Sequence, residues 1–329
     1  MHTPYKIKNE TSSKISLLSL FFTCIIVLYH SDLRYMYPFM SELTSIAISY
    51  FFYISAFFFY KDISNDNYKI RLKKRCFTLL LPYLLWNVIY LLLHIKNYEF
   101  TLHNLIYNFT IQPLCTPSWY LPTLFLFFLP APLFYWCFKR KISTVILFAV
   151  SCIIAYLGYL HFQLQLYEIP YIGGYIIRMF QYYLPYLFGA FIGYHFSDKI
   201  NVTFGKSIIG IASSCIMAIL LLYNIPPILR WLFLMLLPVT IWEALPDKLF
   251  CSKKLIAYIA MPAFFINMAH CYLHSLWHIT PLSGYFTSEK IYMFANIGLT
   301  LLTCYLLYYL LHWICPKFLG ILTGNRNRK

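Results

Sequence analysis

Long apolar segments recur along the whole chain and alternate with short polar stretches. Ten of these segments come close to the roughly 20 residues that an α-helix needs to cross a bilayer. They cover residues 15–31, 43–60, 77–94, 118–138, 143–160, 177–196, 207–223, 229–245, 256–277 and 291–313. The runs are too long and continuous for the alternating strands of a membrane barrel. The pattern therefore predicts an all-α, polytopic integral membrane helix bundle of about ten transmembrane helices.

The overall composition agrees with this pattern. Of the 329 residues, 60% are hydrophobic and only 11% are charged, whereas soluble domains average roughly 25% charged residues. The loops are short, and no soluble domain or internal repeat stands out. We expect a cytoplasmic tail over 1–14, one transmembrane domain over 15–314 and a basic cytoplasmic tail over 315–329. The first segment lacks a small-x-small cleavage site, so we expect it to remain as the first span.

Positive charge is distributed unevenly between alternate loops. If the N-terminus lies inside, 21 of the 26 Lys and Arg residues fall on the cytoplasmic side, and the outer segments keep only Arg34, Lys96, Arg178, Arg230 and Lys290. This asymmetry follows the positive-inside rule and predicts that both termini are cytoplasmic. The net charge of +15 is thus a signal of topology and of contact with membrane lipids. It does not indicate nucleic-acid binding.

The cysteines and histidines do not form a recognisable metal motif. The ten cysteines are scattered without a C-x-x-C pair, so neither a zinc site nor a disulfide framework is indicated, and we expect them to behave as small apolar residues. His270, His274 and His278 recur every four residues, but no carboxylate lies near them in sequence to orient a metal ligand. We therefore predict no bound metal and favour hydrogen-bonded histidines beside a water-accessible cavity.

The first apolar segment ends in the sequence VLYHSD, which places His30 and Asp32 at the membrane boundary. A histidine has the intrinsic pKa of a general base at neutral pH, and a neighbouring carboxylate such as Asp32 would tune it. Arg34 and Glu42 are alternative partners. The plain alternative is that His30 only marks the end of a span.

A basic cluster lies in the inner loop before the third segment. Arg71, Lys74 and Arg75 follow i, i+3, i+4 spacing, so they share one face if the helix extends into the loop. Such a face suits the phosphates of a nucleotide-like cofactor. The alternative is contact with anionic lipid headgroups.

An aromatic pair opens the fourth segment from the outer side. Trp119 and Tyr120 have the position of residues in the aromatic belt at a membrane interface. Their ring faces would also stack on a sugar, so they are candidates for an acceptor pocket.

Six short motifs follow one another along residues 12–280. They are VLYH ending at His30, FFYISAFFF around Ser55, RLKKRCFTLLLPYLLW from Arg71, WYLPTL from Trp119, YLPYLFGAFIG from Tyr183 and FFINMAH ending at His270. No single motif is specific, but their order and topology resemble the membrane-bound acyltransferase-3 family. Members of that family are ten-span bacterial membrane proteins that move acetyl or other acyl groups from coenzyme A to sugars of surface polysaccharides.

The resemblance implies an O-acetyltransferase in the bacterial cytoplasmic (inner) membrane. Acetyl-CoA would be a co-substrate, no cofactor would be tightly bound, and the acceptor would be a polysaccharide or a lipid-linked sugar precursor. His30 with Asp32 would be catalytic, and Arg71, Lys74 and Arg75 would bind the coenzyme. The substrate-binding residues would be Ser55, Trp119, Tyr120 and His270.

Two positions depart from the family pattern. The arginine expected eleven residues before the histidine is Ser19, with Lys14 more than one turn away, and the late tyrosine is Asn267. The family's arginine contact with the acyl donor therefore does not carry over. Three alternatives stay open: a transporter or flippase of a sugar precursor, a different acyltransferase centred on His270 and Asn267, and a structural scaffold.

Overall fold

The regular structure is entirely helical in the part of the chain that can be described. The structure is a computed structural model, and it describes residues 9–31, 37, 39–64, 66–110, 112–163, 180–197, 202–223, 225–250, 253–279 and 288–324. Within these ranges there is no strand. The predicted all-α class is confirmed.

Eight helices of the described ranges are long and apolar enough to cross a membrane. They are Thr11–His30, Met40–Tyr60, Tyr68–Leu93, Lys141–Leu160, Phe204–Leu221, Pro227–Ala244, Leu255–Trp277 and Lys290–Ile314. The bent pair Thr116–Phe128 and Ala131–Phe138 makes a ninth span if it is counted as one. All nine coincide with predicted segments. The remaining prediction, 177–196, matches helix α11 (Tyr183–His195), which at 13 residues is too short to span on its own.

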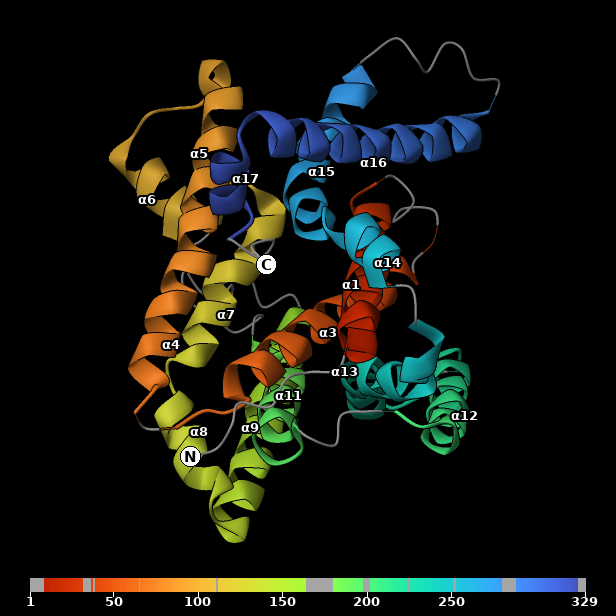
Figure 1. Cartoon of the computed structure of the whole chain (residues 1–329). Coiled ribbons are helices and arrows are strands. Elements are labelled where there is room, and N and C mark those ends of the chain that lie inside the picture. Colours follow the sequence, from red (N-terminus) through yellow and green to blue (C-terminus); the bar gives the residue numbers. More distant parts are fainter. Residues whose placement is uncertain are drawn as a thin grey trace. The chain divides into compact units, whose positions relative to one another are not determined.

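The chain divides into two compact units, and both are assembled from distant segments. Unit 1 comprises Met1–Leu18, Ser45–Arg71 and Leu126–Tyr258, and unit 2 comprises Ser19–Thr44, Leu72–Phe125 and Ile259–Lys329. The boundaries fall within α1 (Asn9–His30), α3 (Met40–Tyr60), α4 (Tyr68–Arg75), α7 (Tyr120–Phe128) and α14 (Lys253–Ala260). Figure 1 shows the helices in the colours of the sequence.

Each unit also contains several complete helices. Those of unit 1 are α8 (Ala131–Phe138), α9 (Lys141–Gln163), α11, α12 (Phe204–Leu221) and α13 (Pro227–Ala244). Those of unit 2 are α5 (Leu81–Leu93), α6 (Leu102–Thr110), α15 (Ala263–Ile279), α16 (Glu289–Ile314) and α17 (Pro316–Leu322).

Small residues bring the helices of unit 1 close together. Gly189 and Gly193, one turn apart on α11, face the backbone of Tyr53 and Phe57 on α3 so closely that a Cβ atom at either glycine would collide with it. Membrane helices gain little from the hydrophobic effect among themselves, so close van der Waals contact of this kind is what holds them together. The glycines of the YLPYLFGAFIG motif therefore serve packing.

Polar side chains reinforce a second contact in unit 1, between α12 and α13. Ser207 Oγ donates to the carbonyl oxygen of Ala244 at 2.5 Å, and Ser214 Oγ donates to Thr240 Oγ1 at 3.0 Å. Gly210, between the two serines, approaches the backbone of Glu243 and Ala244. Hydrogen bonds across such an interface satisfy polar groups that lipid cannot.

The span containing α7 and α8 is interrupted by prolines. α7 ends at Phe128 and α8 begins at Ala131, with Pro130 between them. Two carbonyl oxygens of the break, those of Phe127 and Leu129, accept hydrogen bonds from the hydroxyls of Tyr186 at 2.6 Å and Tyr68 at 2.9 Å. Unit 1 thus supplies partners for backbone groups that the helix itself leaves open.

A buried ion pair ties the start of α1 to the segment after α13. The Lys14 ammonium, 0% exposed, donates to the carbonyl of Leu245 at 2.5 Å and lies 3.3 Å from Asp247 Oδ1. It also lies 4.1 Å from the centre of the Trp242 ring. Thr11 Oγ1 donates to the other carboxylate oxygen of Asp247 at 2.8 Å. These contacts stabilise the buried charge and fix the helix start.

In unit 2, the C-terminal helix packs on the third span. A π-helical turn, Cys76–Leu80, precedes Pro82 and joins α4 to α5 in one span, and a proline is a common cause of such a local adjustment. Trp86 Nε1 on α5 donates to the carbonyl of Leu322 at 3.2 Å, and α17 lies against α5 (Figure 1). Helix α17 lies beyond residue 314, the predicted end of the transmembrane domain. At the other end, α1 begins at Asn9, before the predicted start at residue 15.

Candidate active site

His30 is the last residue of α1 and belongs to unit 2. At this end of the helix the Ser31 N–H and Oγ both donate to the carbonyl of Leu28, at 3.3 and 2.5 Å. The His30 ring is half-buried and stands edge-on to Tyr29. Asp32, its predicted partner, lies outside the described residues, so the pairing of the two stays a prediction.

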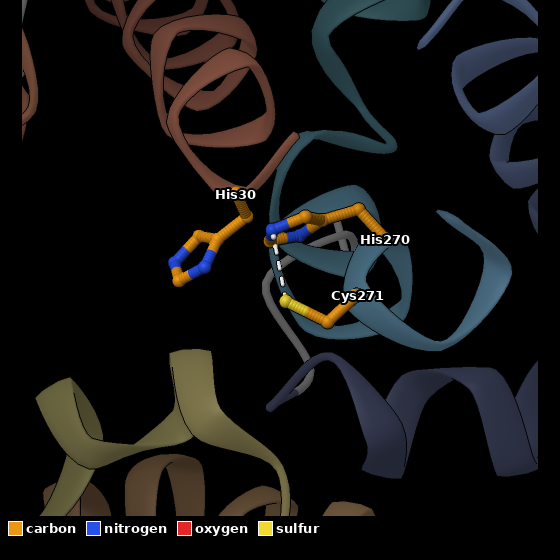
Figure 2. A group of neighbouring side chains, drawn as sticks. All are labelled: His30, His270 and Cys271. Carbon is orange, nitrogen blue, oxygen red and sulfur yellow. Dashed lines mark hydrogen bonds between the residues drawn. The ribbon is translucent and has the colours of Figure 1, made fainter. Parts of the chain in front are cut away.

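The structure gives His30 a neighbour that is 240 residues away in the chain. The ring centroids of His30 and His270 are 5.2 Å apart, with their planes inclined at 52°. His270 comes from α15 and is fully buried, at 0% exposure. Figure 2 shows the two imidazoles side by side, one from each helix. The structure therefore brings together two histidines that belong to the first and the last of the sequence motifs.

Cys271 completes the cluster. Its Sγ lies 3.3 Å from His270 Nε2 (Figure 2). The other ring nitrogen, Nδ1, lies 3.0 Å from the carbonyl oxygen of Ile266. A carbonyl can only accept, so Nδ1 carries the proton and Nε2 is the acceptor that faces the thiol. We call His30, His270 and Cys271 the histidine–cysteine cluster.

The histidine–cysteine cluster has the side-chain types of a metal site. One ligand atom from each of the three side chains lies within 4.8 Å of the others. In the part of the chain that the structure describes, the group includes no carboxylate. Two imidazoles and a thiol at this spacing are also groups that can exchange protons.

The part of α15 that carries the cluster is held by α5. The Tyr90 hydroxyl donates to the carbonyl of Met268 at 3.1 Å and accepts from the N–H of Tyr272 at 3.1 Å. These two groups are four residues apart, the pair that an α-helix ordinarily joins directly. Tyr90 therefore inserts a hydroxyl beside the backbone of residues 268–272 and can set the direction of His270 and Cys271.

A second set of contacts holds the segment before α7 near the same helix. Asn87 Nδ2 donates to Ser118 Oγ at 3.2 Å, and the N–H of Cys115 donates to Asn87 Oδ1 at 3.2 Å. The Cys115 thiol donates to the carbonyl of Met268 at 3.5 Å. Burial raises the pKa of this thiol, so Cys115 stays a neutral donor. It has a structural role.

Trp119 and Tyr120 lie beside this segment in unit 2. Both side chains are half-buried, and the 3-10 turn Thr116–Trp119 packs on α15, the helix that carries His270. The turn that carries Trp119 thus contacts the same helix as the cluster. Ser55 is half-buried on α3 in unit 1.

The three basic residues predicted to bind the coenzyme all lie on α4. Arg71 donates from Nη1 to the carbonyl of Phe59 at 2.9 Å and from Nη2 to that of Asp62 at 3.3 Å, which ties α4 to the end of α3. Lys74 is exposed and Arg75 is half-buried. Arg71 therefore has a structural role in connecting these two helices, and part of its guanidinium group is already used there.

The family's arginine position is occupied by a half-buried serine, Ser19, on α1. Lys14, the nearest preceding basic residue, is held by Leu245 and Asp247. The ammonium of Lys14 is therefore committed to the ion pair of unit 1 and does not stand in for the arginine.

Sequence reasoning singles out His30 and His270 but not their contact, and it groups Cys271 with the other cysteines. One signal sets Cys271 apart: it directly follows His270 and stands one helical turn after Asn267. The Tyr90 hydroxyl and its two backbone partners carry no signal in the sequence, because their contact depends on how α5 packs on α15.

Comparison with protein families identifies the family of the chain. A family model described as an acyltransferase domain matches residues 14–322. The chain belongs to the acyltransferase-3 family. The match covers the histidine–cysteine cluster and most of both units, and this acyltransferase-3 protein is a multi-pass membrane acyltransferase. No curated protein and no solved structure matches the chain significantly.

Proposed function

We propose that this acyltransferase-3 protein transfers an acetyl group from acetyl-CoA to a hydroxyl of a cell-surface polysaccharide or of its lipid-linked sugar precursor. The observation that carries the proposal is the meeting of His30 and His270 in a chain of this family. A neutral imidazole at the end of a membrane span can take the proton of an attacking sugar hydroxyl. We place the protein in the bacterial cytoplasmic membrane with both termini inside.

The donor would enter from the cytoplasmic end of the third span. Lys74 and Arg75, with the remaining donors of Arg71, would bind the coenzyme phosphates. Tyr90 follows Arg75 by fifteen positions, which is a rise of about 22 Å along a helix. Tyr90 touches the backbone next to His270. The extended arm of coenzyme A would run along α5 over this distance and present its thioester to the cluster.

The acceptor would reach the cluster from the outer side. The turn that carries Trp119 packs on α15, and Trp119 and Tyr120 would stack on the sugar ring. His30, at the end of α1, would accept the hydroxyl proton while the oxygen attacks the acyl carbon. General-base assistance of this kind is worth about 10²–10⁴-fold in rate.

The test uses cells that lack the gene and carry either the wild-type protein or His30→Ala at equal protein levels. We expect the O-acetyl content of the surface glycans, measured after mild alkaline release, to be restored by wild type and not by His30→Ala. The matched control is His103→Ala, an exposed histidine on α6 of the same unit. Acetylation that is unchanged by His30→Ala would refute the role of His30.

A binding measurement separates the enzyme from a transporter. The purified protein in lipid nanodiscs should bind acetyl-CoA, and Lys74→Ala together with Arg75→Ala should weaken that binding as the charge on α4 is removed. Export of a lipid-linked sugar without any binding of acetyl-CoA would instead identify a flippase.

A further inference from the structure

We infer that Cys271 carries the acyl group as a thioester on its way from donor to acceptor, so that the reaction proceeds through an acyl-enzyme. The inference rests on the proposed function and adds a covalent intermediate to it. The class of substrate for this step is an acyl thioester. Cys271 Sγ is the nucleophile, and His270 is the base that serves it.

The geometry of the pair is that of an activated nucleophile. Cys271 Sγ is within hydrogen-bond reach of His270 Nε2, at 3.3 Å (Figure 2). The Ile266 carbonyl fixes the opposite nitrogen as the donor, at 3.0 Å. A nucleophile, a base at hydrogen-bond distance and a third group that orients the base are the recurring parts of covalent catalysis.

An unpaired polar atom on the same side of α15 points to a bound ligand. Asn267 lies one turn before Cys271, so both project from one side of the helix. Its Oδ1 is buried and has no hydrogen-bond partner among the described residues. A buried acceptor without a donor is unfavourable, because it has lost its hydrogen bonds to water. An amide N–H from the arm of coenzyme A would supply the missing donor beside the thiol.

The first step is a thioester exchange. Cys271 Sγ attacks the carbonyl carbon of acetyl-CoA, and its proton passes to His270 Nε2. The bond from that carbon to the coenzyme sulfur breaks, and the departing thiolate takes the proton from His270. One thioester is lost and one is formed, so the step needs no oxidant, reductant or further reactant.

The second step uses His30. The acceptor hydroxyl attacks the carbonyl carbon of the Cys271 thioester, and its proton passes to the His30 ring, 5.2 Å from the His270 ring. The bond from the carbon to Cys271 Sγ breaks, and the thiolate regains a proton from His30. The products are the sugar ester and the free thiol. Two histidines thus serve two half-reactions.

The same three side chains would also ligate a metal ion, and the observations favour the acyl-enzyme. The Sγ to Nε2 contact is a hydrogen-bond distance within one helix, which a proton accounts for without an ion. The proposed donor, acetyl-CoA, is itself a thioester, and the exchange of one thioester for another does not require a metal. A metal that occupied the cluster would block both half-reactions, so metal content is part of the test.

The experiment incubates the detergent-purified full-length protein with radiolabelled acetyl-CoA in the absence of any acceptor. We expect one acetyl group per chain, released by neutral hydroxylamine as a thioester is, and located by mass spectrometry on the peptide that contains Cys271. Cys271→Ala should carry no label. Cys24→Ala, the matched half-buried cysteine on α1, should label as wild type does.

Two histidine variants separate the half-reactions. His270→Ala should slow the labelling by about 10²–10⁴-fold. His30→Ala should label fully and then fail to pass the acetyl group to the sugar. Size-exclusion profiles identify variants that do not fold. If Cys271→Ala is lost, Cys271→Ser replaces it, and any acetyl group taken up by its hydroxyl is an oxygen ester, which resists neutral hydroxylamine.

Three results would overturn the acyl-enzyme. They are an unlabelled wild type that still transfers acetyl groups, full transfer by Cys271→Ala, and one equivalent of zinc held by the cluster in an unlabelled protein. If Cys271→Ala transfers fully, His30→Ala would still be inactive. The proposed function would then be retained and only the covalent intermediate would be refuted. A wild type that neither binds acetyl-CoA nor transfers its acetyl group would remove both.

Discussion

Helix α1 carries a buried or half-buried polar residue near each end, and the structure uses the two differently. Lys14, in unit 1, is surrounded by partners: the Leu245 carbonyl, the Asp247 carboxylate and the Trp242 ring. His30, in unit 2, meets two neutral groups, His270 and Cys271. Asn267 lies on α15 with His270 and Cys271, and its buried Oδ1 has no hydrogen-bond partner among the described residues.

The difference concerns which polar groups a membrane protein can bury and at what cost. A charge inside the bilayer is costly, so Lys14 is tolerated because its contacts compensate it. Neutral imidazoles and a thiol cost less to bury and can exchange protons with a substrate. We therefore expect substitution of Lys14 to change the stability of the protein. Substitution of His30, His270 or Cys271 is expected to change its activity.

The largest effect on stability is expected from Lys14→Met. It leaves the Asp247 carboxylate buried without its ammonium partner, which should lower the free energy of unfolding by about 3–5 kcal/mol. Denaturant unfolding of the purified protein in micelles measures it. Lys14→Met combined with Asp247→Asn should recover part of the loss, because no unpaired charge is then left. A single variant as stable as wild type would break the comparison.

A smaller loss is expected from Gly189→Ala in the scaffold of unit 1. The added Cβ collides with the Tyr53 backbone, and forcing the two helices apart should cost about 1–3 kcal/mol. Gly205→Ala on α12 is the matched control, because a Cβ there meets nothing within 4 Å. The same unfolding measurement should show no cost for the control. Equal losses in both variants would contradict the close-packing interpretation.

Tyr90→Phe should have a mixed effect, since its hydroxyl supports the helix that carries the cluster. Loss of the two hydrogen bonds should cost about 0.5–1.5 kcal/mol each. The turnover number for acetyl transfer should fall roughly tenfold if His270 and Cys271 shift, a change of ~1.4 kcal/mol. Tyr83→Phe on the same helix, whose hydroxyl bonds the Phe109 carbonyl, should lose stability and keep its turnover.

The smallest change in stability is expected for His30→Gln. The amide keeps hydrogen-bonding capacity, so the free energy of unfolding should change by less than about 1 kcal/mol, while acetyl transfer should be lost. Unfolding and transfer are measured on one preparation. A loss of stability as large as that of Lys14→Met would show that His30 is a structural residue too.

Much of the fold follows from local pattern. The hydropathy segments coincide with helices, because a span must satisfy its backbone internally and needs about 20 apolar residues. Pro130 and Pro132 likewise mark the break between α7 and α8, because a proline cannot donate the backbone hydrogen bond that a continuous helix needs. The hydroxyl partners of that break, Tyr68 and Tyr186, could not be foreseen, since they come from distant segments.

The candidate site was predictable only in its separate members. His30 stands out because it ends an apolar segment, and His270 because it belongs to a row of histidines and to a family motif. Cys271 has no such mark. Cys271 becomes a candidate because its Sγ lies 3.3 Å from His270 Nε2. The direction of a side chain on a helix depends on tertiary packing, which cannot be read from the sequence.

By itself, then, the sequence determined the helical membrane class, the positions of the spans, the acyltransferase-3 motifs and the two histidines. Each of these depends on residue type and spacing within one segment or, for the family motifs, on their order along the chain. The tertiary structure alone decided that His30 meets His270 and Cys271, that Lys14 pairs with Asp247, and that Tyr90 holds α15. The physical reason is that such contacts join helices far apart in the chain. Which helices pack together depends on small residues that allow close approach and on hydrogen bonds between helices.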